Sequence, residues 1–289
     1  MNRLFTEAES AEIVIERLAG CDDPRFRAVM EAAIRHLHAF VKEVEPTVGE
    51  WAQAIRFLTA TGQMCDDRRQ EWILASDVLG VSMLVETLNN RSEGGATEAT
   101  VLGPFHVEGA PQLEPGSNIC RDGKGMPCLV SGRVTDVEGR PLAGAVLDIW
   151  QTNADGFYDV QQPELQPEIN LRGRFLADAD GRYAFRTVRP VSYPVPTDGP
   201  VGDILRRMGR HAWRPAHIHF IASKPGYRRL VTHIFAHDDP YIDSDAVFGV
   251  KESLLVEFRE QEDDALAREL GMESPFCTAR FDIRLAREG

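Results

Sequence analysis

The chain has 289 residues, enough for one large domain or two ordinary ones, and its 43% hydrophobic and 27% charged residues are typical of a globular protein. Its formal net charge of −13 argues against nucleic acid and anionic membranes as partners, and no apolar run approaches the length of a membrane-spanning helix. The acidic start MNRLFTEAESAE lacks the apolar segment of a secretion signal, and five scattered cysteines form no CxxC pair, so we expect reduced thiols in a cytoplasm.

The N-terminal third of the chain carries helix signals. Asp23-Pro24 combines an N-cap residue with a proline at the first helical position, and apolar residues follow it at helical spacing. The Thr47-x-x-Glu50 pattern is a capping box in front of another apolar run. A last long helix is predicted from Arg68 to about Leu88, across the apolar stretch WILASDVLGVSMLVETL.

The pattern changes after the polar, glycine-rich stretch NNRSEGGATEAT, which is typical of a linker. Beyond it apolar residues alternate with polar ones between turn signals, as in AHIHFIA, RLVTHIFAH and CTARFDIRL. Short strands without helices between them favour an antiparallel β-sandwich or barrel. We therefore expect an α+β protein, with a helical domain over residues 1–103 followed by an antiparallel β-sandwich over residues 104–289.

Two His-x-His pairs differ in their context. His36 and His38 lie in a segment of helical period, where two positions are a turn of about 200°, so they cannot share a metal ion. His217 and His219, in WRPAHIHF, lie in a strand-like segment, where alternate side chains project from the same face. They indicate a metal site, although strand histidines also pack and form hydrogen bonds.

Two tyrosines and an arginine could add to such a site. Tyr158 follows a turn in TNADGFYDV, and Tyr193 lies in the proline-dense VSYPVPTDGPVG; packing with a hydrogen-bonded hydroxyl is the alternative for both. A tyrosine ligand must lose its proton, which favours ferric iron over zinc. Arg214 could stabilise negative charge on a substrate or form a structural ion pair, and His233 faces either the core or a pocket.

In this order, the segments GFYD, VSYPVPTDGP, RPAHIHF and DAVFGVK resemble the intradiol ring-cleavage dioxygenases of aromatic catabolism. The resemblance implies a homodimer made by the helical region, in some members with phospholipid between the dimer's helices, and a β-sandwich that holds iron. It implies one non-haem Fe(III) per subunit, with Tyr158, Tyr193, His217 and His219 as ligands. It also implies that Tyr193 leaves the metal when substrate arrives and that Arg214 stabilises carbanion character on the ring.

Within that family the resemblance is to members that cleave hydroxyquinol (benzene-1,2,4-triol) with O2 to 3-hydroxy-cis,cis-muconate, the enol form of maleylacetate. Catechol-type relatives usually have glutamine at the position of His233. Asp77, a carboxylate among apolar residues, could bind a third substrate hydroxyl or form an internal hydrogen bond. The substrate pocket that the resemblance implies is formed by Leu74, Asp77, Val101, Leu102, Gly103, Pro104, Phe105, Val195, Arg214, His233 and Val247.

Two alternatives remain open. One is the same chemistry on catechol or a chlorocatechol, since DAVFGVK also occurs in chlorocatechol enzymes. The other is a β-sandwich that binds a metal ion or a ligand without catalysis.

Overall fold

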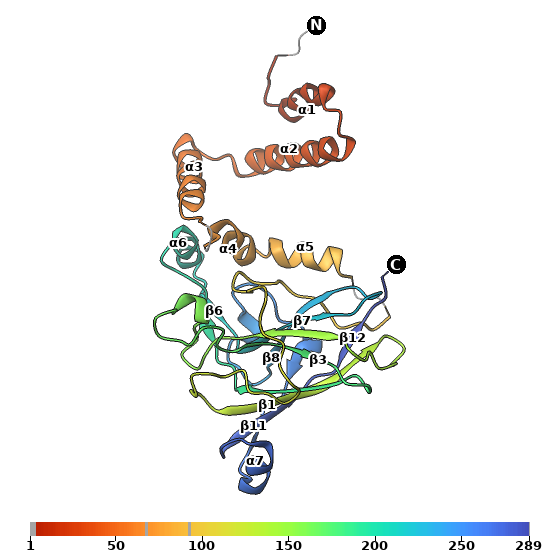
Figure 1. Ribbon diagram of the computed structural model, residues 1–289. Helices are drawn as coiled ribbons and strands as arrows, with labels where there is room; N and C mark the ends of the chain where they lie inside the picture. The colour runs from red at the N-terminus through yellow and green to blue at the C-terminus, as the bar shows by residue number, and fades with distance from the viewer. Residues whose placement is uncertain (1–3, 67–68, 92–93, 289) are drawn as a thin grey trace. The chain divides into compact units, whose positions relative to one another are not determined.

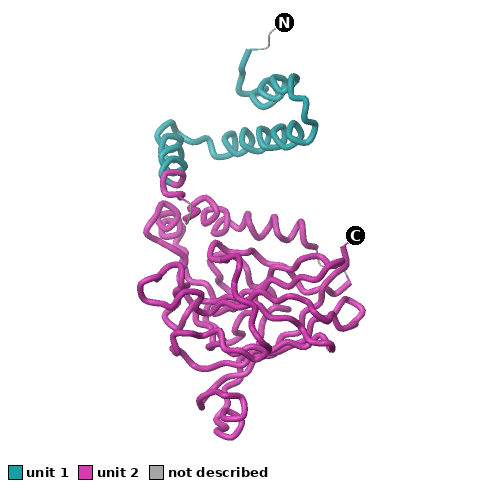
Figure 2. Tube along the Cα trace, in the orientation of Figure 1, with its two compact units in different colours: residues 1–60 teal, residues 61–289 magenta. Residues whose placement is uncertain are grey.

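The computed structural model describes residues 4–66, 69–91 and 94–288. The chain forms two compact units, Met1–Ala60 and Thr61–Gly289 (Figure 2). No helix among the described residues has the length and apolar character needed to cross a membrane. Both predicted tyrosine ligands and both predicted histidine ligands belong to the second unit.

Helices come first along the chain and strands follow (Figure 1). The helices are α1 (Ser10–Glu16), α2 (Pro24–Val44), α3 (Val48–Gln63), α4 (Glu71–Val78), α5 (Val81–Asn89), α6 (Pro200–Arg207) and α7 (Asp264–Leu270). Asp23 caps α2 as predicted, because its Oδ1 accepts hydrogen bonds from the N–H groups of Arg25 and Phe26 at 2.9 and 3.0 Å. Thr47 and Glu50 form the predicted capping box, with side-chain to backbone bonds of 2.8 and 3.2 Å in the two directions.

The single long helix predicted from Arg68 to about Leu88 is wrong, and Arg68 itself lies outside the described residues. Two helices, α4 and α5, replace it and meet at Gly80, whose φ of 75° is left-handed. A glycine adopts this conformation without strain and so ends one helix and starts the next. Asp77 is therefore a residue of the last turn of a short helix.

Within the described residues, the strands form two five-stranded sheets and one small two-stranded sheet. Their bounds are β1 (Pro127–Asp136), β2 (Val146–Trp150), β3 (Arg172–Leu176), β4 (Arg182–Val188), β5 (Tyr193–Pro194), β6 (Trp213–Arg214), β7 (His217–Ser223), β8 (Leu230–Ala236), β9 (Leu255–Val256), β10 (Arg259–Gln261), β11 (Phe276–Arg280) and β12 (Ile283–Leu285). The first sheet has the order β10-β11-β1-β12 with β4 paired to β1, the second has the order β3-β2-β7-β8-β9, and β5 pairs with β6.

The sandwich is confirmed, but its purely antiparallel character is wrong. Strand β1 pairs in parallel with β11 and β12, and β8 pairs in parallel with β9. The side-chain period is two residues in both kinds of pairing, so sequence alternation cannot tell them apart. Gly132 permits the crossing from β11 to β12, because a Cβ there would lie 1.7 Å from the carbonyl oxygen of Phe281.

The core lies between the two large sheets. The ring of Phe185 on β4 contacts that of Phe220 on β7, with centroids 6.0 Å apart. Ile218, Phe220 and Ala222 belong to this core cluster, and all three are buried. The alternate residues of β7, which include both predicted histidine ligands, project from the opposite face of the same sheet.

Candidate metal centre

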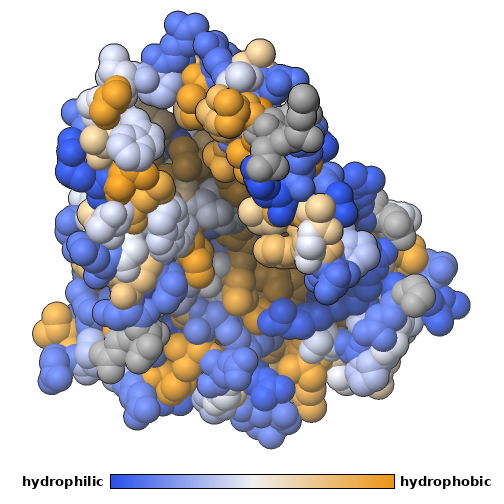
Figure 3. All heavy atoms as spheres, turned by 90° about the horizontal axis from the view of Figure 1, so that it is seen from above, coloured by the Kyte–Doolittle hydropathy of each residue, from blue (hydrophilic) through white to orange (hydrophobic). Residues whose placement is uncertain are grey.

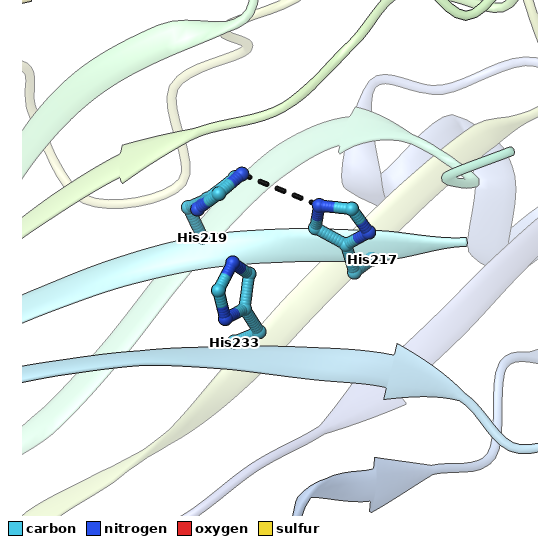
Figure 4. Close-up of side chains that lie close together, drawn as sticks. All are labelled: His217, His219 and His233. Atoms are coloured by element: carbon cyan, nitrogen blue, oxygen red, sulfur yellow. Dashed lines mark hydrogen bonds between the residues drawn. The ribbon is translucent and has the colours of Figure 1, made fainter. Parts of the chain in front are cut away.

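Strand β7 gives the centre its two histidines. His217 and His219 are 2% exposed each, and their Nε2 atoms lie 3.3 Å apart (Figure 4). His233 lies directly opposite His219 on the neighbouring strand β8, with ring centroids 4.1 Å apart. One ligand atom from each of the three histidines can be chosen so that all lie within 4.8 Å of one another, so this histidine cluster could hold a metal ion. By contrast, His38 lies on helix α2 and its Nδ1 is 3.1 Å from Ser10 Oγ.

Two tyrosine hydroxyls meet the same pair of histidines. Tyr158 Oη lies 2.7 Å from His219 Nε2 and 2.9 Å from Tyr193 Oη, and Tyr193 Oη lies 3.3 Å from His217 Nε2. Tyr158 ends the loop after β2, and Tyr193 belongs to β5, which pairs with Arg214 on β6. Four polar atoms from three parts of the chain thus form a closed ring.

Hydrogen bonding and burial favour the neutral form of both histidines, in which one ring nitrogen has a lone pair for a metal ion. His217 Nδ1 lies 2.7 Å from the carbonyl oxygen of Pro215, which can only accept, so Nδ1 carries the proton and Nε2 is the free acceptor. Burial, helped by the charge of Arg214, lowers the pKa of His217 to about 3. Burial and the neighbouring His233 and His217 lower the pKa of His219 well below its usual value. Both rings are therefore neutral at neutral pH, the form in which histidine binds metal ions.

The tyrosines need a cation to ionise. Burial and then the second phenol raise the pKa of Tyr158 well above its usual value. Burial also raises the pKa of Tyr193, although the charge of Arg214 acts against it. A strongly Lewis-acidic ion would reverse both effects, because it stabilises the phenolate form directly.

The geometry of the four atoms fits a single metal ion. Donor atoms bound to one ion at about 2.0–2.1 Å lie roughly 2.8–3.4 Å from one another. The ring formed by Tyr158, Tyr193, His217 and His219 has separations of 2.7, 2.9, 3.3 and 3.3 Å. The ring of Trp150 stacks on His219 at 4.5 Å and 13°, which fixes the plane of that imidazole.

A mostly apolar cavity of about 220 Å³ opens beside Tyr193. Its size suits one aromatic ring, since an apolar cavity of about 150 Å³ binds benzene in another protein. Of the predicted pocket residues, it is lined by Leu74, Asp77, Val101, Gly103, Pro104, Phe105, Val195, Arg214 and Val247. Leu102 and His233 do not line it; Leu102 is 37% exposed, and His233 is fully buried behind His219.

Arg214 reaches the cavity from the metal centre. Its Nη1 lies 3.2 Å from His217 Nε2, and its Nε donates to Asp245 Oδ1 at 3.1 Å. Burial raises the pKa of Asp245, but the charge and hydrogen bond of Arg214 outweigh it, so the pKa lies below its usual value. Asp245 therefore holds the arginine charged inside the protein and aims the guanidinium at the cavity.

Asp77 places a carboxyl group in the same cavity. It is 6% exposed, and burial raises its pKa, an effect that a hydrogen bond from Ser82 and the charge of Arg214 oppose. An internal partner and the cavity are thus both within its reach. This carboxyl group is able to hold a proton or to accept a hydrogen bond from a ligand.

Several residues around the centre were not singled out from the sequence. Asp245 lies in the quoted DAVFGVK, but nothing there marks it as the partner of Arg214. Arg69, Glu71 and Gln161 also line the cavity. Arg69 donates to Glu71 at 2.9 Å and to Asp198 at 2.8 Å, an ion-pair network that joins residues distant in sequence. Charged residues at helix starts are common, so no local signal distinguishes these.

Comparison with known proteins places the chain in a family. A family model described as Dioxygenase matches residues 101–287, and one described as Catechol dioxygenase N terminus matches residues 23–97. The chain belongs to the intradiol ring-cleavage dioxygenase family. This intradiol dioxygenase is 57% identical to hydroxyquinol 1,2-dioxygenase of Rhizobium sp. over 284 residues, which cover 98% of this chain and 96% of that protein.

Further relatives and solved structures support the same family. It is 54% identical to 6-chlorohydroxyquinol 1,2-dioxygenase of Cupriavidus pinatubonensis, over 90% of this chain and 94% of that one. The solved structure of hydroxyquinol 1,2-dioxygenase from Pseudomonas putida superposes with a TM-score of 0.91 at 51% identity, covering 98% of this chain and 99% of that one. For catechol 1,2-dioxygenase of Acinetobacter radioresistens the TM-score is 0.86 at 26% identity, with 100% and 95% covered.

Proposed function

We propose that this dioxygenase is a non-haem Fe(III) enzyme of aromatic catabolism that cleaves hydroxyquinol with O2. Ring opening between the two adjacent hydroxyl-bearing carbons would give 3-hydroxy-cis,cis-muconate, the enol form of maleylacetate. The observation that carries the proposal is the ring of four donor atoms, 2.7–3.3 Å apart, beside a cavity of aromatic size. Identities of 57% and 54% to enzymes named for hydroxyquinol and 6-chlorohydroxyquinol support the choice of substrate.

Tyr158, Tyr193, His217 and His219 would hold one iron per subunit. Fe(III) bound there would supply the Lewis acidity that draws both adjacent hydroxyls of the substrate as anions. Of the two tyrosines, only Tyr193 lines the cavity among the described residues. We assign Tyr193 the role of accepting a proton from the substrate at its Oη. Arg214, held charged by Asp245, would stabilise the negative charge that develops on the ring.

Asp77 would distinguish the triol from catechol. The carboxyl group is buried in a cavity that Leu74 and Val247 also line. A ligand hydroxyl that forms a hydrogen bond with it therefore compensates for the hydration that burial removes. The third hydroxyl of hydroxyquinol supplies such a partner, whereas with catechol the carboxyl group has only its internal partner Ser82. Catechol or chlorocatechol cleavage remains the second candidate. A non-catalytic sandwich is disfavoured by the charged Arg214 beside the donor ring.

The metal content of the purified protein tests the iron proposal. We expect about one iron per chain and a wine-red absorption band, because electron transfer from a tyrosinate to Fe(III) absorbs visible light. A folded, colourless, iron-free preparation that cannot be reconstituted with iron contradicts it.

The proposal extends to assembly and organisation. Helix α2 exposes Phe26, Leu37 and Phe40, each more than half exposed. Hydrophobic residues are also visible at the surface in Figure 3. Such exposed apolar side chains support pairing with a second copy. We therefore propose a homodimer made through the helical region, residues 1–103, with the four iron ligands in residues 104–289 and a cytoplasmic location. Residues at the end of the helical region, such as Leu74 and Asp77, also line the substrate cavity. Sedimentation analysis at micromolar concentration should give twice the chain mass. Nothing in the described residues supports the bound phospholipid that the resemblance allows.

A further inference from the structure

Arg172 joins two parts of the site that are far apart in sequence. It lies on strand β3, its side chain is 2% exposed, and its guanidinium donates three hydrogen bonds. Nε and Nη2 donate to Asp159 Oδ1 at 2.8 and 2.6 Å, and Nη1 donates to the carbonyl oxygen of Phe105 at 2.7 Å. The two acceptors therefore lie on opposite branches of one planar fork.

Each acceptor lies in, or directly next to, a residue of an aromatic stack. Asp159 directly follows the proposed ligand Tyr158, and Phe105 lines the substrate cavity. The rings of Phe105 and Tyr158 lie 4.6 Å apart at 26°. The guanidinium carbon of Arg172 lies 5.9 Å from the centre of the Tyr158 ring. One buried cation thus binds the backbone of Phe105 and the side chain of the residue that follows Tyr158.

The register of the sheet supports the same arrangement. Arg172 pairs with Trp150 on β2, and Trp150 pairs with His219 on β7. Residues directly opposite each other project from the same face, and Trp150 stacks on His219. Arg172 therefore begins a row of side chains that includes a second proposed ligand, His219.

We infer that Arg172 is a positioning residue, which holds the stack of Phe105 and Tyr158 so that the cavity wall and the metal ligand keep one fixed geometry. The inference rests on the proposed function, because it takes Tyr158 as an iron ligand and Phe105 as a substrate contact. Arg172 touches neither substrate nor metal in this role. It acts through Asp159 and the Phe105 carbonyl.

Arg172→Lys tests the geometry in the iron-loaded enzyme. Lysine keeps the positive charge beside Asp159, but a single ammonium group on a flexible stem cannot reproduce the three-bond fork. We expect iron to be retained. KM for hydroxyquinol should rise about tenfold, because the variant loses one or two of the hydrogen bonds that hold the cavity wall. The charge-transfer band should shift or broaden as the Tyr158 ring gains freedom. Arg174→Lys, two residues along the same strand and partly exposed, is the matched control and should change neither.

Asp159→Asn tests the electrostatics and serves where Arg172→Lys fails to fold. Asparagine still accepts from the guanidinium, but the charge of Arg172 is then no longer balanced, so it stabilises the phenolate 5.9 Å away. We expect the charge-transfer band to move to shorter wavelength, a change that loss of packing alone would not produce.

The outcomes separate the two claims. A wild-type protein without iron and colour overturns the proposed function itself. A coloured wild type whose Arg172→Lys variant keeps both KM and absorption overturns the role of Arg172 alone. Where Arg172→Lys does not fold, an unchanged band in Asp159→Asn overturns it equally.

Discussion

Tyr158 Oη lies 2.7 Å from His219 Nε2, although the two residues are 61 positions apart in the chain. The loop after β2 delivers the tyrosine, and the outward face of β7 delivers the histidine. Neither residue would be a strong metal signal alone. Their convergence, with Tyr193 and His217 closing the ring, gives the mixed phenol and imidazole donor set that favours ferric iron.

Tyr158→Phe should remove most of the colour and most of the activity. The substitution deletes a single oxygen from the donor ring and keeps the aromatic stack with Phe105. Visible absorption, iron content and turnover of hydroxyquinol are the measurements. Absorption identical to that of the wild type would exclude Tyr158 from the ligand set.

Tyr183→Phe is the matched control for that substitution. Tyr183 is also buried, and its hydroxyl donates to the carbonyl oxygen of Phe281 at 2.6 Å, in the core between the sheets and not in the donor ring. Losing this bond should lower the free energy of unfolding by about 1 kcal/mol. Colour and activity should not change.

Asp77→Asn should weaken the preference for the triol over catechol. A buried carboxylate that meets a hydroxyl makes a charge-assisted bond, and replacing it with an amide should lower the ratio of the two kcat/KM values about tenfold. Iron content should stay constant, because Asp77 is not in the donor ring. An unchanged ratio would mean that Asp77 only forms an internal hydrogen bond with Ser82 and does not contact the substrate.

The stability of the Asp77→Asn variant should depend on pH relative to the wild type. Burial raises the pKa of Asp77 in the folded protein above its ordinary value of 3.8. The folded state therefore holds this proton more tightly than the unfolded state does, and the wild type loses stability as pH rises through the raised pKa. The difference in unfolding free energy, variant minus wild type, should grow as pH rises above about 4, the ordinary value of this pKa. A difference independent of pH would contradict this reading.

Asp245→Ala should destabilise the fold strongly. It leaves Arg214, 4% exposed, as a buried charge without its carboxylate, at a cost of about 3–5 kcal/mol. Chemical denaturation is the measurement. Asp180→Ala is the control, since it removes an ion pair with Arg182 whose side chains are 58% and 68% exposed and should change stability by less than about 1 kcal/mol.

Much of the fold followed from local pattern. Alternation placed His217 and His219 on one face of a strand, and the cap residues Asp23 and Thr47 placed two helix starts, because these signals act over a few residues. The parallel pairing of β1 with β11 could not be predicted from the sequence, because the direction of strand pairing depends on the path of the whole chain. The break at Gly80 was missed because a lone glycine inside an apolar run is compatible with a helix.

The candidate site, like the fold, could be predicted only in part. The donor residues were marked by type and motif, whereas the residues that support them were not. Asp245 acts through Arg214, and Arg172 acts through Asp159 and the Phe105 carbonyl. No local spacing in the sequence reports such pairings. The ligand assignment and the pocket roles stay predictions until the variants are measured.

Turnover of three diols by the iron-loaded wild type tests the central claim most directly. Oxygen uptake and product formation should be followed with hydroxyquinol, catechol and a chlorocatechol under the same conditions. The account predicts that kcat/KM is highest for hydroxyquinol, with 3-hydroxy-cis,cis-muconate or maleylacetate as the product. Catechol turned over far faster than the triol would contradict it.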